Sequence, residues 1–191
     1  TQIATVGQTG LVPGRALRLY IVDLENGEYI NPVLLLPDLA DTLAPAIGTV
    51  YARSADALYD LRQTRVLPSG RYEITARIDD RIATTRTAPS VAPYTVRVFV
   101  AGQETYGVIM DRVAVRAGET RLEPRGGDAD TLYGVEGGFS LGSVSLAAGQ
   151  VSLEFVAVDF AGNQASWSVN LTAALPEPAS AEAASREGGA R

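Results

Sequence analysis

Residues 71–78 read RYEITARI, and in this stretch Tyr72, Ile74, Ala76 and Ile78 alternate with polar, charged or small residues. A period of two residues is that of a β-strand with one face buried against a core. The stretch therefore predicts a half-buried strand rather than a helix.

Comparable runs recur on both sides of this stretch, and turn residues such as Gly, Pro and Asn separate them. Many short strands with regularly spaced turns are typical of a β-sandwich. No stretch of a dozen residues keeps the helical spacing of apolar side chains. The sequence predicts an all-β, antiparallel sandwich over residues 48–174, with further strands at residues 49–53, 57–61, 94–100, 107–113, 120–123, 137–146, 151–158 and 165–171.

The flanks of this region have a different composition. We expect a strand at residues 17–22, a turn at Asn26-Gly27 and a second short strand, followed by a linker at residues 37–47 with two prolines. An isolated hairpin is marginal in water, so we expect the hairpin of residues 3–22 to dock on the sandwich or to be mobile. Residues 175–191 are small and polar, and they are predicted to form a disordered tail.

Composition excludes several classes of protein. The formal net charge is -6, which argues against nucleic-acid binding because a phosphate-binding surface needs a basic face. The chain has no His and no Cys, so a Ser-His-Asp triad, a thiolate nucleophile and a His-ligated zinc site are excluded within it. No apolar run approaches the roughly 20 residues that span a bilayer. We expect no cofactor, no bound metal and no membrane span.

Loop carboxylates are the remaining candidate ligands. Asp128, Asp130 and Asp159 offer the oxygen ligands that calcium prefers, but no run has the alternating ligand spacing of a calcium loop. A simpler interpretation is that the first two are solvated loop charges, and that Asp159 and Asn163 cap N–H groups of a turn. Calcium binding by these carboxylates is left open. Residues 79–80, two adjacent aspartates, are expected to point to opposite faces of a strand and to share no proton.

Four aromatic residues allow two interpretations. Tyr94, Phe139, Phe155 and Trp167 offer the flat rings of a sugar-stacking platform. Their positions in predicted strands favour a role in filling the sandwich core instead.

Residues 3–37, IATVGQTGLVPGRALRLYIVDLENGEYINPVLLLP, resemble the C-terminal part of the M23 (LytM-type) peptidoglycan endopeptidase domain. The resemblance covers about a fifth of the chain and needs no gap. It implies a partial LytM-type β-sheet segment at residues 1–36, within a longer, exported protein of the bacterial periplasm or cell envelope. The residues that match are Val6-Gly7-Gln8-Thr9-Gly10, Gly14, Leu17, Tyr20-Ile21, Gly27 and Asn31-Pro32.

The chain differs from this family at the positions of the catalytic residues. The family's His-x-His pair, which supplies a zinc ligand and a catalytic histidine, aligns with Ala16 and Arg18. Alanine has no ligating atom, and an arginine is a permanent cation that repels a divalent metal. The resemblance therefore implies a pseudoenzyme without catalytic residues, with Arg18, Tyr20 and Asn31 as candidate ligand-binding residues. Arg18 would pair with a peptide carboxylate, or it is simply an exposed strand arginine.

Residues 151–163, VSLEFVAVDFAGN, resemble the last hairpin of many bacterial Ig-like repeats. Together the two resemblances imply an Ig-like sandwich after a degenerate M23 segment, in a protein that binds peptidoglycan or regulates a cell-wall hydrolase. Two alternatives stay open. The chain is a fragment of an active zinc M23 endopeptidase whose catalytic residues lie outside it, or it is a structural Ig-like adhesion or spacer module.

Overall fold

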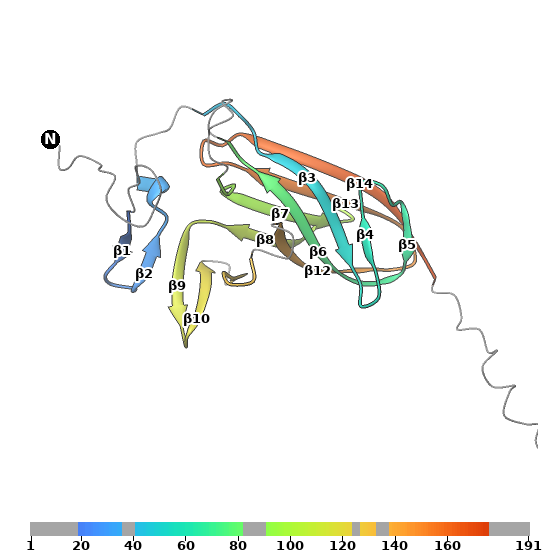
Figure 1. The fold of residues 1–191 in the computed structure, drawn as a ribbon, viewed down its shortest axis with the longest axis horizontal. Helices are drawn as coiled ribbons and strands as arrows, with labels where there is room; N and C mark the ends of the chain where they lie inside the picture. The colour runs from blue at the N-terminus through green and yellow to red at the C-terminus, as the bar shows by residue number, and fades with distance from the viewer. Residues whose placement is uncertain (1–18, 36–40, 82–90, 124–126, 133–137, 176–191) are drawn as a thin grey trace, which may run out of the picture.

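The computed structural model describes residues 19–35, 41–81, 91–123, 127–132 and 138–175. Over these residues the protein is all-β, as the sequence predicts. Fourteen strands form three sheets, and the one other regular element described is the short 3-10 helix η1 (Pro32–Leu35) (Figure 1).

Two of the sheets pack face to face and form a sandwich (Figure 1). The four-stranded sheet has the order β12 (Phe139–Leu146), β6 (Gly70–Asp79), β3 (Ala46–Arg53) and β4 (Leu58–Asp60). The five-stranded sheet has the order β5 (Val66–Pro68), β14 (Gln164–Ala174), β13 (Gly149–Val158), β7 (Thr95–Val100) and β8 (Gln103–Ile109). Their strand pairs are antiparallel except for the parallel pair β5–β14.

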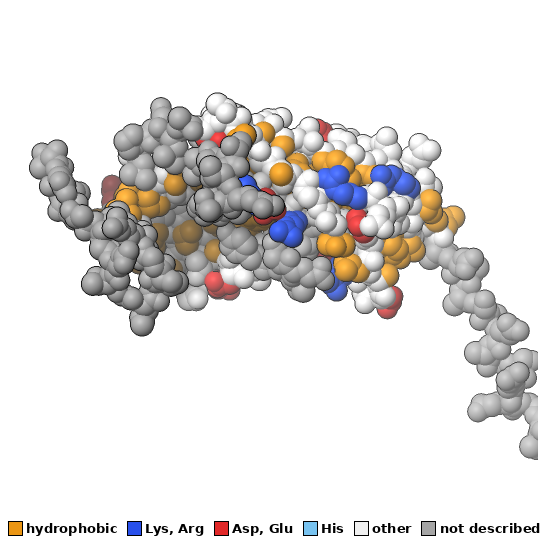
Figure 2. Space-filling view, turned by 45° about the horizontal axis from the view of Figure 1, so that its top comes forward, with side chains coloured by type: hydrophobic (Ala, Val, Ile, Leu, Met, Phe, Trp, Pro, Cys, Tyr) orange, Lys and Arg blue, Asp and Glu red, His pale blue; other side chains and the backbone are white. Residues whose placement is uncertain are grey.

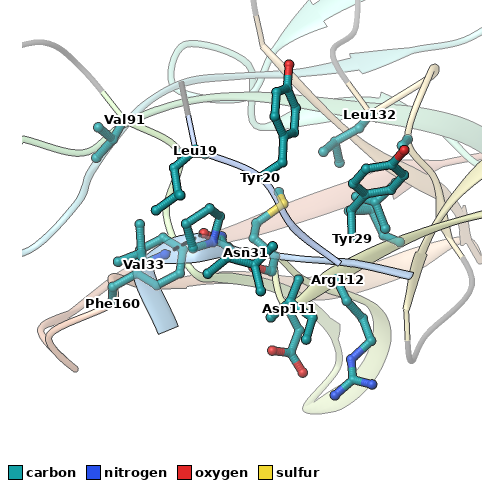
Figure 3. Close-up of a pocket in the computed structure, with 18 residues that line it drawn as sticks. Leu19, Tyr20, Tyr29, Asn31, Val33, Val91, Asp111, Arg112, Leu132 and Phe160 are labelled. Atoms are coloured by element: carbon teal, nitrogen blue, oxygen red, sulfur yellow. Dashed lines mark hydrogen bonds between the residues drawn. The ribbon is translucent and has the colours of Figure 1, made fainter. Parts of the chain in front are cut away.

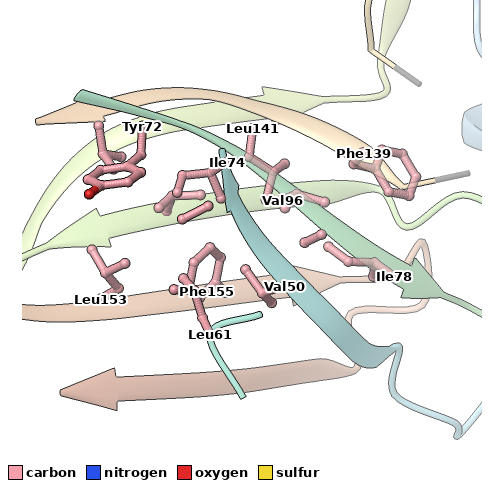
Figure 4. Close-up of a cluster of buried hydrophobic side chains, with 14 of the residues drawn as sticks. Val50, Leu61, Tyr72, Ile74, Ile78, Val96, Phe139, Leu141, Leu153 and Phe155 are labelled. Carbon is pink, nitrogen blue, oxygen red and sulfur yellow. The ribbon is translucent and has the colours of Figure 1, made fainter. Parts of the chain in front are cut away.

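The core lies between these two sheets and consists of aliphatic and aromatic side chains that alternate along each strand (Figure 4). On β6 the predicted inward face, from Tyr72 to Ile78, is buried as expected. From the facing sheet, Val96, Leu153 and Phe155 are fully buried against it. The structure therefore confirms the strand and the buried face that the period-two pattern predicts.

The four aromatic residues belong to this core, as the simpler interpretation predicts. Phe139 and Phe155 are buried, and Tyr94 and Trp167 pack partly buried against the same cluster. Trp167 stacks on Phe155 with ring centroids 5.5 Å apart, across the β13–β14 pair. They form no exposed platform for a sugar.

The third sheet, called the attached sheet below, has the order β1 (Ile21–Asp23), β2 (Glu28–Ile30), β9 (Arg112–Arg116), β10 (Glu119–Glu123) and β11 (Gly127–Asp128). The hairpin β9–β10 follows β8 directly and projects from the sandwich, and β1–β2 lies beside it (Figure 1). β2 pairs with β9 in antiparallel register. The hairpin β1–β2 is therefore docked on β9, whereas the predicted hairpin of residues 3–22 lies, except for residues 19–22, outside the described residues.

Some strand boundaries differ from the prediction. Residues 107–113 were predicted as one strand, but the chain breaks at Met110 and Asp111 and continues as β9 in the attached sheet. The break lets the chain leave one sheet and enter another. The pattern also missed the short strands β5 and β11. Residues 1–18, which include Ala16 and Arg18, and residues 176–191 of the predicted tail at 175–191 lie outside the described residues.

Candidate functional site

A buried carboxylate attaches the N-terminal hairpin to β9. Glu28 is 7% exposed, and its two oxygens accept hydrogen bonds from Arg112 at 3.2 Å and from Arg116 at 2.8 Å. Glu28 pairs with Ala114 in the sheet, so the two arginines stand two residues to either side on the same face. Charge-assisted bonds to a largely buried acid are stronger than bonds between neutral groups, so they fix this register.

Asn31 anchors the exit of the hairpin. Its backbone N–H donates to the carbonyl of Asp111 at 2.9 Å, and its side-chain Nδ2 donates to the carbonyl of Met110 at 2.8 Å. Its Oδ1 accepts the N–H of Val33 at 3.1 Å, where η1 begins. The Asn-Pro pair thus joins the hairpin to the point where β8 ends and β9 starts.

An apolar groove of about 540 Å³ lies between the docked hairpin and the sandwich (Figure 3). Leu19, Tyr20 and Val33 line it from the N-terminal segment, and Met110 and Leu132 line it from later parts of the chain. Val91, Ala92 and Phe160 contribute the wall that belongs to the sandwich. A concave, mostly apolar surface of this size is typical of a ligand or peptide site.

Two tyrosines stand at the rim of this groove. The rings of Tyr20 and Tyr29 meet edge to face with centroids 6.4 Å apart, and Tyr20 is 63% exposed. In Figure 3 both hydroxyl groups point away from the apolar side chains, while Asp111 and Arg112 lie together at another part of the lining. The lining is therefore apolar with a polar rim, as in protein-binding surfaces.

Tyr20 and Asn31, two of the three predicted ligand-binding residues, both line the groove. Arg18 lies outside the described residues. No sequence pattern pointed to Val91, Met110 or Phe160, because segments such as those of Asn31 and Met110, which are 79 positions apart, meet only in the fold.

A cluster of three carboxylates lies at the end of the sandwich near the groove. Asp41 precedes β3, Asp80 follows β6, and Asp159 begins the turn between β13 and β14; one oxygen of each lies within 4.8 Å of the others. Asp80 is 2% exposed and Asp159 is 1% exposed. Residues 79 and 80 do point to opposite sides, because Asp79 is partly exposed while Asp80 is buried.

The turn holds the carboxylate of Asp159 and the backbone of Asp41 in place. Asp159 accepts hydrogen bonds from the backbone N–H and from Nδ2 of Asn163, both at 2.8 Å, which confirms the predicted cap. The same Nδ2 donates to the backbone carbonyl of Asp41 at 3.2 Å. Burial, followed by the negative charges of Asp159 and Asp41, raises the pKa of Asp80 to about 6. The cluster is preformed, and its surroundings disfavour the ionised form of Asp80.

The other two candidate carboxylates lie apart from this cluster. Asp128 and Asp130 are exposed, and Oδ1 of Asp128 accepts the N–H of Asp130 at 2.9 Å. This is the behaviour of loop charges that shape their own turn.

The visible surface has no single charge character. In Figure 2, arginine side chains are interspersed with apolar and acidic ones over the sandwich. Within the described ranges, no helix is long and apolar enough to span a bilayer.

Comparison with known proteins gives a family but no function. No curated protein and no solved structure matches the chain. The model of one uncharacterised protein family matches residues 44–174, which include all of the sandwich strands. This match spans more than half of the chain, so the chain belongs to that family.

Proposed function

We propose that the chain is a non-catalytic module of the bacterial cell envelope that regulates a cell-wall hydrolase by binding an apolar segment of it. The observation that carries this proposal is the apolar groove of about 540 Å³ at the junction of the docked hairpin and the sandwich. The resemblance of residues 3–37 to the M23 domain supplies the cellular setting, an exported protein of the periplasm.

Two features support a role without catalysis. The positions of the M23 His-x-His pair hold Ala16 and Arg18, and the chain has no His or Cys at all. Among the described residues that line the groove, the charged ones are Asp111 and Arg112. An aspartate next to an arginine supplies neither an activated nucleophile with a general base nor a set of metal ligands.

The lining favours a protein segment over peptidoglycan itself. Sugars and wall peptides carry many hydroxyl, amide and carboxylate groups, and burying them without hydrogen bonds is costly. The side chains of Leu19, Val33, Val91 and Phe160 offer no such bonds. Tyrosines at the rim, such as Tyr20 and Tyr29, are enriched at protein interfaces because one end of the side chain is apolar and the other stays wet.

The groove is fixed before a partner arrives. The Glu28 ion pairs hold the hairpin to β9, and the bonds of Asn31 hold its exit to the backbone of Met110 and Asp111, where β8 of the sandwich ends. A preorganised site loses less conformational freedom on binding, which raises affinity.

The test is direct binding of this chain to purified M23-type hydrolases of the same cell, together with the rate of muropeptide release. We expect the chain to bind one of them and change its rate. Val33→Glu places a charge in the groove and should weaken binding at least about tenfold. Val66→Glu makes the same change at an exposed site on β5 and should leave binding unchanged.

Other results would favour the alternatives. Retention on purified peptidoglycan that Val33→Glu leaves intact would favour direct wall binding at another surface. Stoichiometric zinc together with muropeptide cleavage, by this chain or by any protein that contains it, would favour an active M23 enzyme. Absence of binding to both hydrolases and peptidoglycan would leave the spacer or adhesion module as the better account.

A further inference from the structure

The carboxylate cluster has no role in the proposed function, yet it breaks the usual rules for buried charge. Asp41, Asp80 and Asp159 bring one oxygen each to within 4.8 Å of one another, and two of the three are almost fully buried. Buried charges in proteins are normally paired or bound to metal ions. We therefore expect a positive charge to lie next to the cluster when its carboxylates are ionised.

Asp80 supplies an independent sign of a missing ligand. Its Oδ1 is buried and accepts no hydrogen bond. Among all the described residues it is the one buried side-chain polar atom without a partner. Leaving a carboxylate oxygen in this state costs the desolvation energy of that group, unless a ligand occupies the position.

The protein itself offers no cation to the cluster within the described ranges. The four ion pairs found there join Arg77 to Asp79, Arg112 and Arg116 to Glu28, and Arg121 to Glu119. None of them involves a carboxylate of the cluster.

We propose that Asp41, Asp80 and Asp159 together bind a calcium ion. Calcium takes oxygen ligands at about 2.3–2.6 Å, so one ion equidistant from three oxygens binds them when they lie up to about 4.5 Å apart. The oxygens of the cluster lie within 4.8 Å of one another, so small side-chain rotations suffice to bring them to that distance. Magnesium needs shorter bonds in octahedral geometry and gives up its water reluctantly, which suits two buried carboxylates poorly. A chain without His or Cys has no ligands that would favour zinc or copper.

The ion would join three separate parts of the fold. Asp41 belongs to the segment that leads from the N-terminal hairpin into β3, and Asp80 and Asp159 close the ends of β6 and β13. Asp80 also pairs through its backbone with Val91, and Asp159 precedes Phe160; both neighbours line the groove. Calcium would stabilise this end of the sandwich whether or not the groove binds a hydrolase.

The test is calorimetric titration of the full chain with calcium chloride after treatment with EDTA, paired with thermal unfolding. We expect one ion per chain and a higher melting temperature in calcium, with affinity in the range from micromolar to millimolar. Asp80→Asn keeps the shape of the side chain and should lower the affinity at least about tenfold. In EDTA this variant should melt no lower than the wild type, because it removes a buried negative charge that lies beside two other carboxylates.

Asp130→Asn makes the same charge change at an exposed loop carboxylate and should bind calcium like the wild type. Absence of calcium binding up to about 10 mM would overturn the proposal, because even weak extracellular modules bind within that range. Binding that Asp80→Asn leaves unchanged, or an equal response to magnesium, would overturn it as well.

Discussion

The sandwich and the attached sheet are both built from antiparallel strands, but they bury very different side chains. Between the sandwich sheets lies a continuous apolar core that includes Phe155, Leu153 and Ile74, all fully buried. In the described attached sheet the buried residues are Glu28, Ala114 and Leu122. Its edge strand β1 is followed by Leu24, which is 92% exposed.

This difference implies that global unfolding depends on the sandwich, whereas local opening depends on the attached sheet. Apolar area removed from water dominates folding free energy, so the sandwich sets the global stability of the chain. In the attached sheet, Leu122 of β10 belongs to the core cluster, but the hairpin β1–β2 is held to β9 by three residue pairings, by the Glu28 ion pairs and by the bonds of Asn31. Such a unit opens locally at a lower free energy than the core.

The largest effect is expected in the sandwich core. Phe155→Ala removes a fully buried ring that stacks on Trp167, and we expect it to lower the free energy of unfolding by about 3–5 kcal/mol. Denaturant unfolding followed by tryptophan fluorescence measures this loss. Phe99→Ala, at a half-buried position of β7, is the matched control and should cost clearly less. Equal losses would show that the core between the sheets is not the main source of stability.

The next effect comes from the carboxylate cluster. In EDTA, burial and the neighbouring charges raise the pKa of Asp80 from 3.8 to about 6. Well below pH 3.8 the Asp80 carboxyl is protonated in both the folded and the unfolded chain, so it does not lower the free energy of unfolding. As pH rises to 6 the unfolded chain releases its proton first, so stability falls by about 3 kcal/mol. Urea unfolding in EDTA between pH 4 and 7 measures this fall.

A single variant isolates the contribution of Asp80 to this pH profile. Asp80→Asn cannot ionise, so the decline between pH 4 and pH 6 should become shallower in EDTA. An unchanged profile in this variant would show that other carboxylates cause the decline.

A smaller and local effect is expected at the attached sheet. Glu28→Ala leaves Arg112 and Arg116 without their shared acid, and we expect a loss of about 2 kcal/mol confined to β1, β2 and β9. Hydrogen exchange should become faster at residues 21–30 while β13 and β14 stay protected. Glu25→Ala, in the exposed turn of the same hairpin, is the control. Faster exchange throughout the sandwich would mean that the two regions unfold as one unit.

Periodicity predicted the sandwich well and the attached sheet poorly, for one physical reason. A strand with one face in a core alternates apolar and polar residues, as RYEITARI does, and this signal is local in sequence. Strands β1, β2 and β11 of the attached sheet have two or three residues each, too few for a period to appear, and the same holds for β5 of the sandwich. The break at Met110 and Asp111 lies between the apolar residues 108–110 and 113–115, with no glycine or proline to mark it, so the pattern favoured one continuous strand.

In the candidate sites, too, contacts between residues close in sequence could be predicted and contacts between distant residues could not. The cap formed by Asp159 and Asn163 was predictable, because the two residues lie four positions apart in one turn. The partnership of Asp159 with Asp41 and Asp80 was not, because it depends on where three distant chain segments end in space. The groove likewise forms only when the N-terminal hairpin docks beside the sandwich, and no sequence motif marks the residues of its sandwich wall.

The smallest expected effect lies in the turn of the N-terminal hairpin. Gly27 has a φ of +68°, a conformation that costs a residue with a Cβ about 1 kcal/mol. No atom outside its chain neighbours lies within 4 Å of a Cβ built there, so backbone strain alone sets the loss. Gly27→Ala should therefore speed exchange at β1 and β2 less than Glu28→Ala does. Gly127→Ala, in β11 of the same sheet, also meets open space but has no such φ, and it should change stability by less than about 0.5 kcal/mol. If Gly27→Ala proved as disruptive as Glu28→Ala, the turn rather than the ion pairs would hold the hairpin to β9.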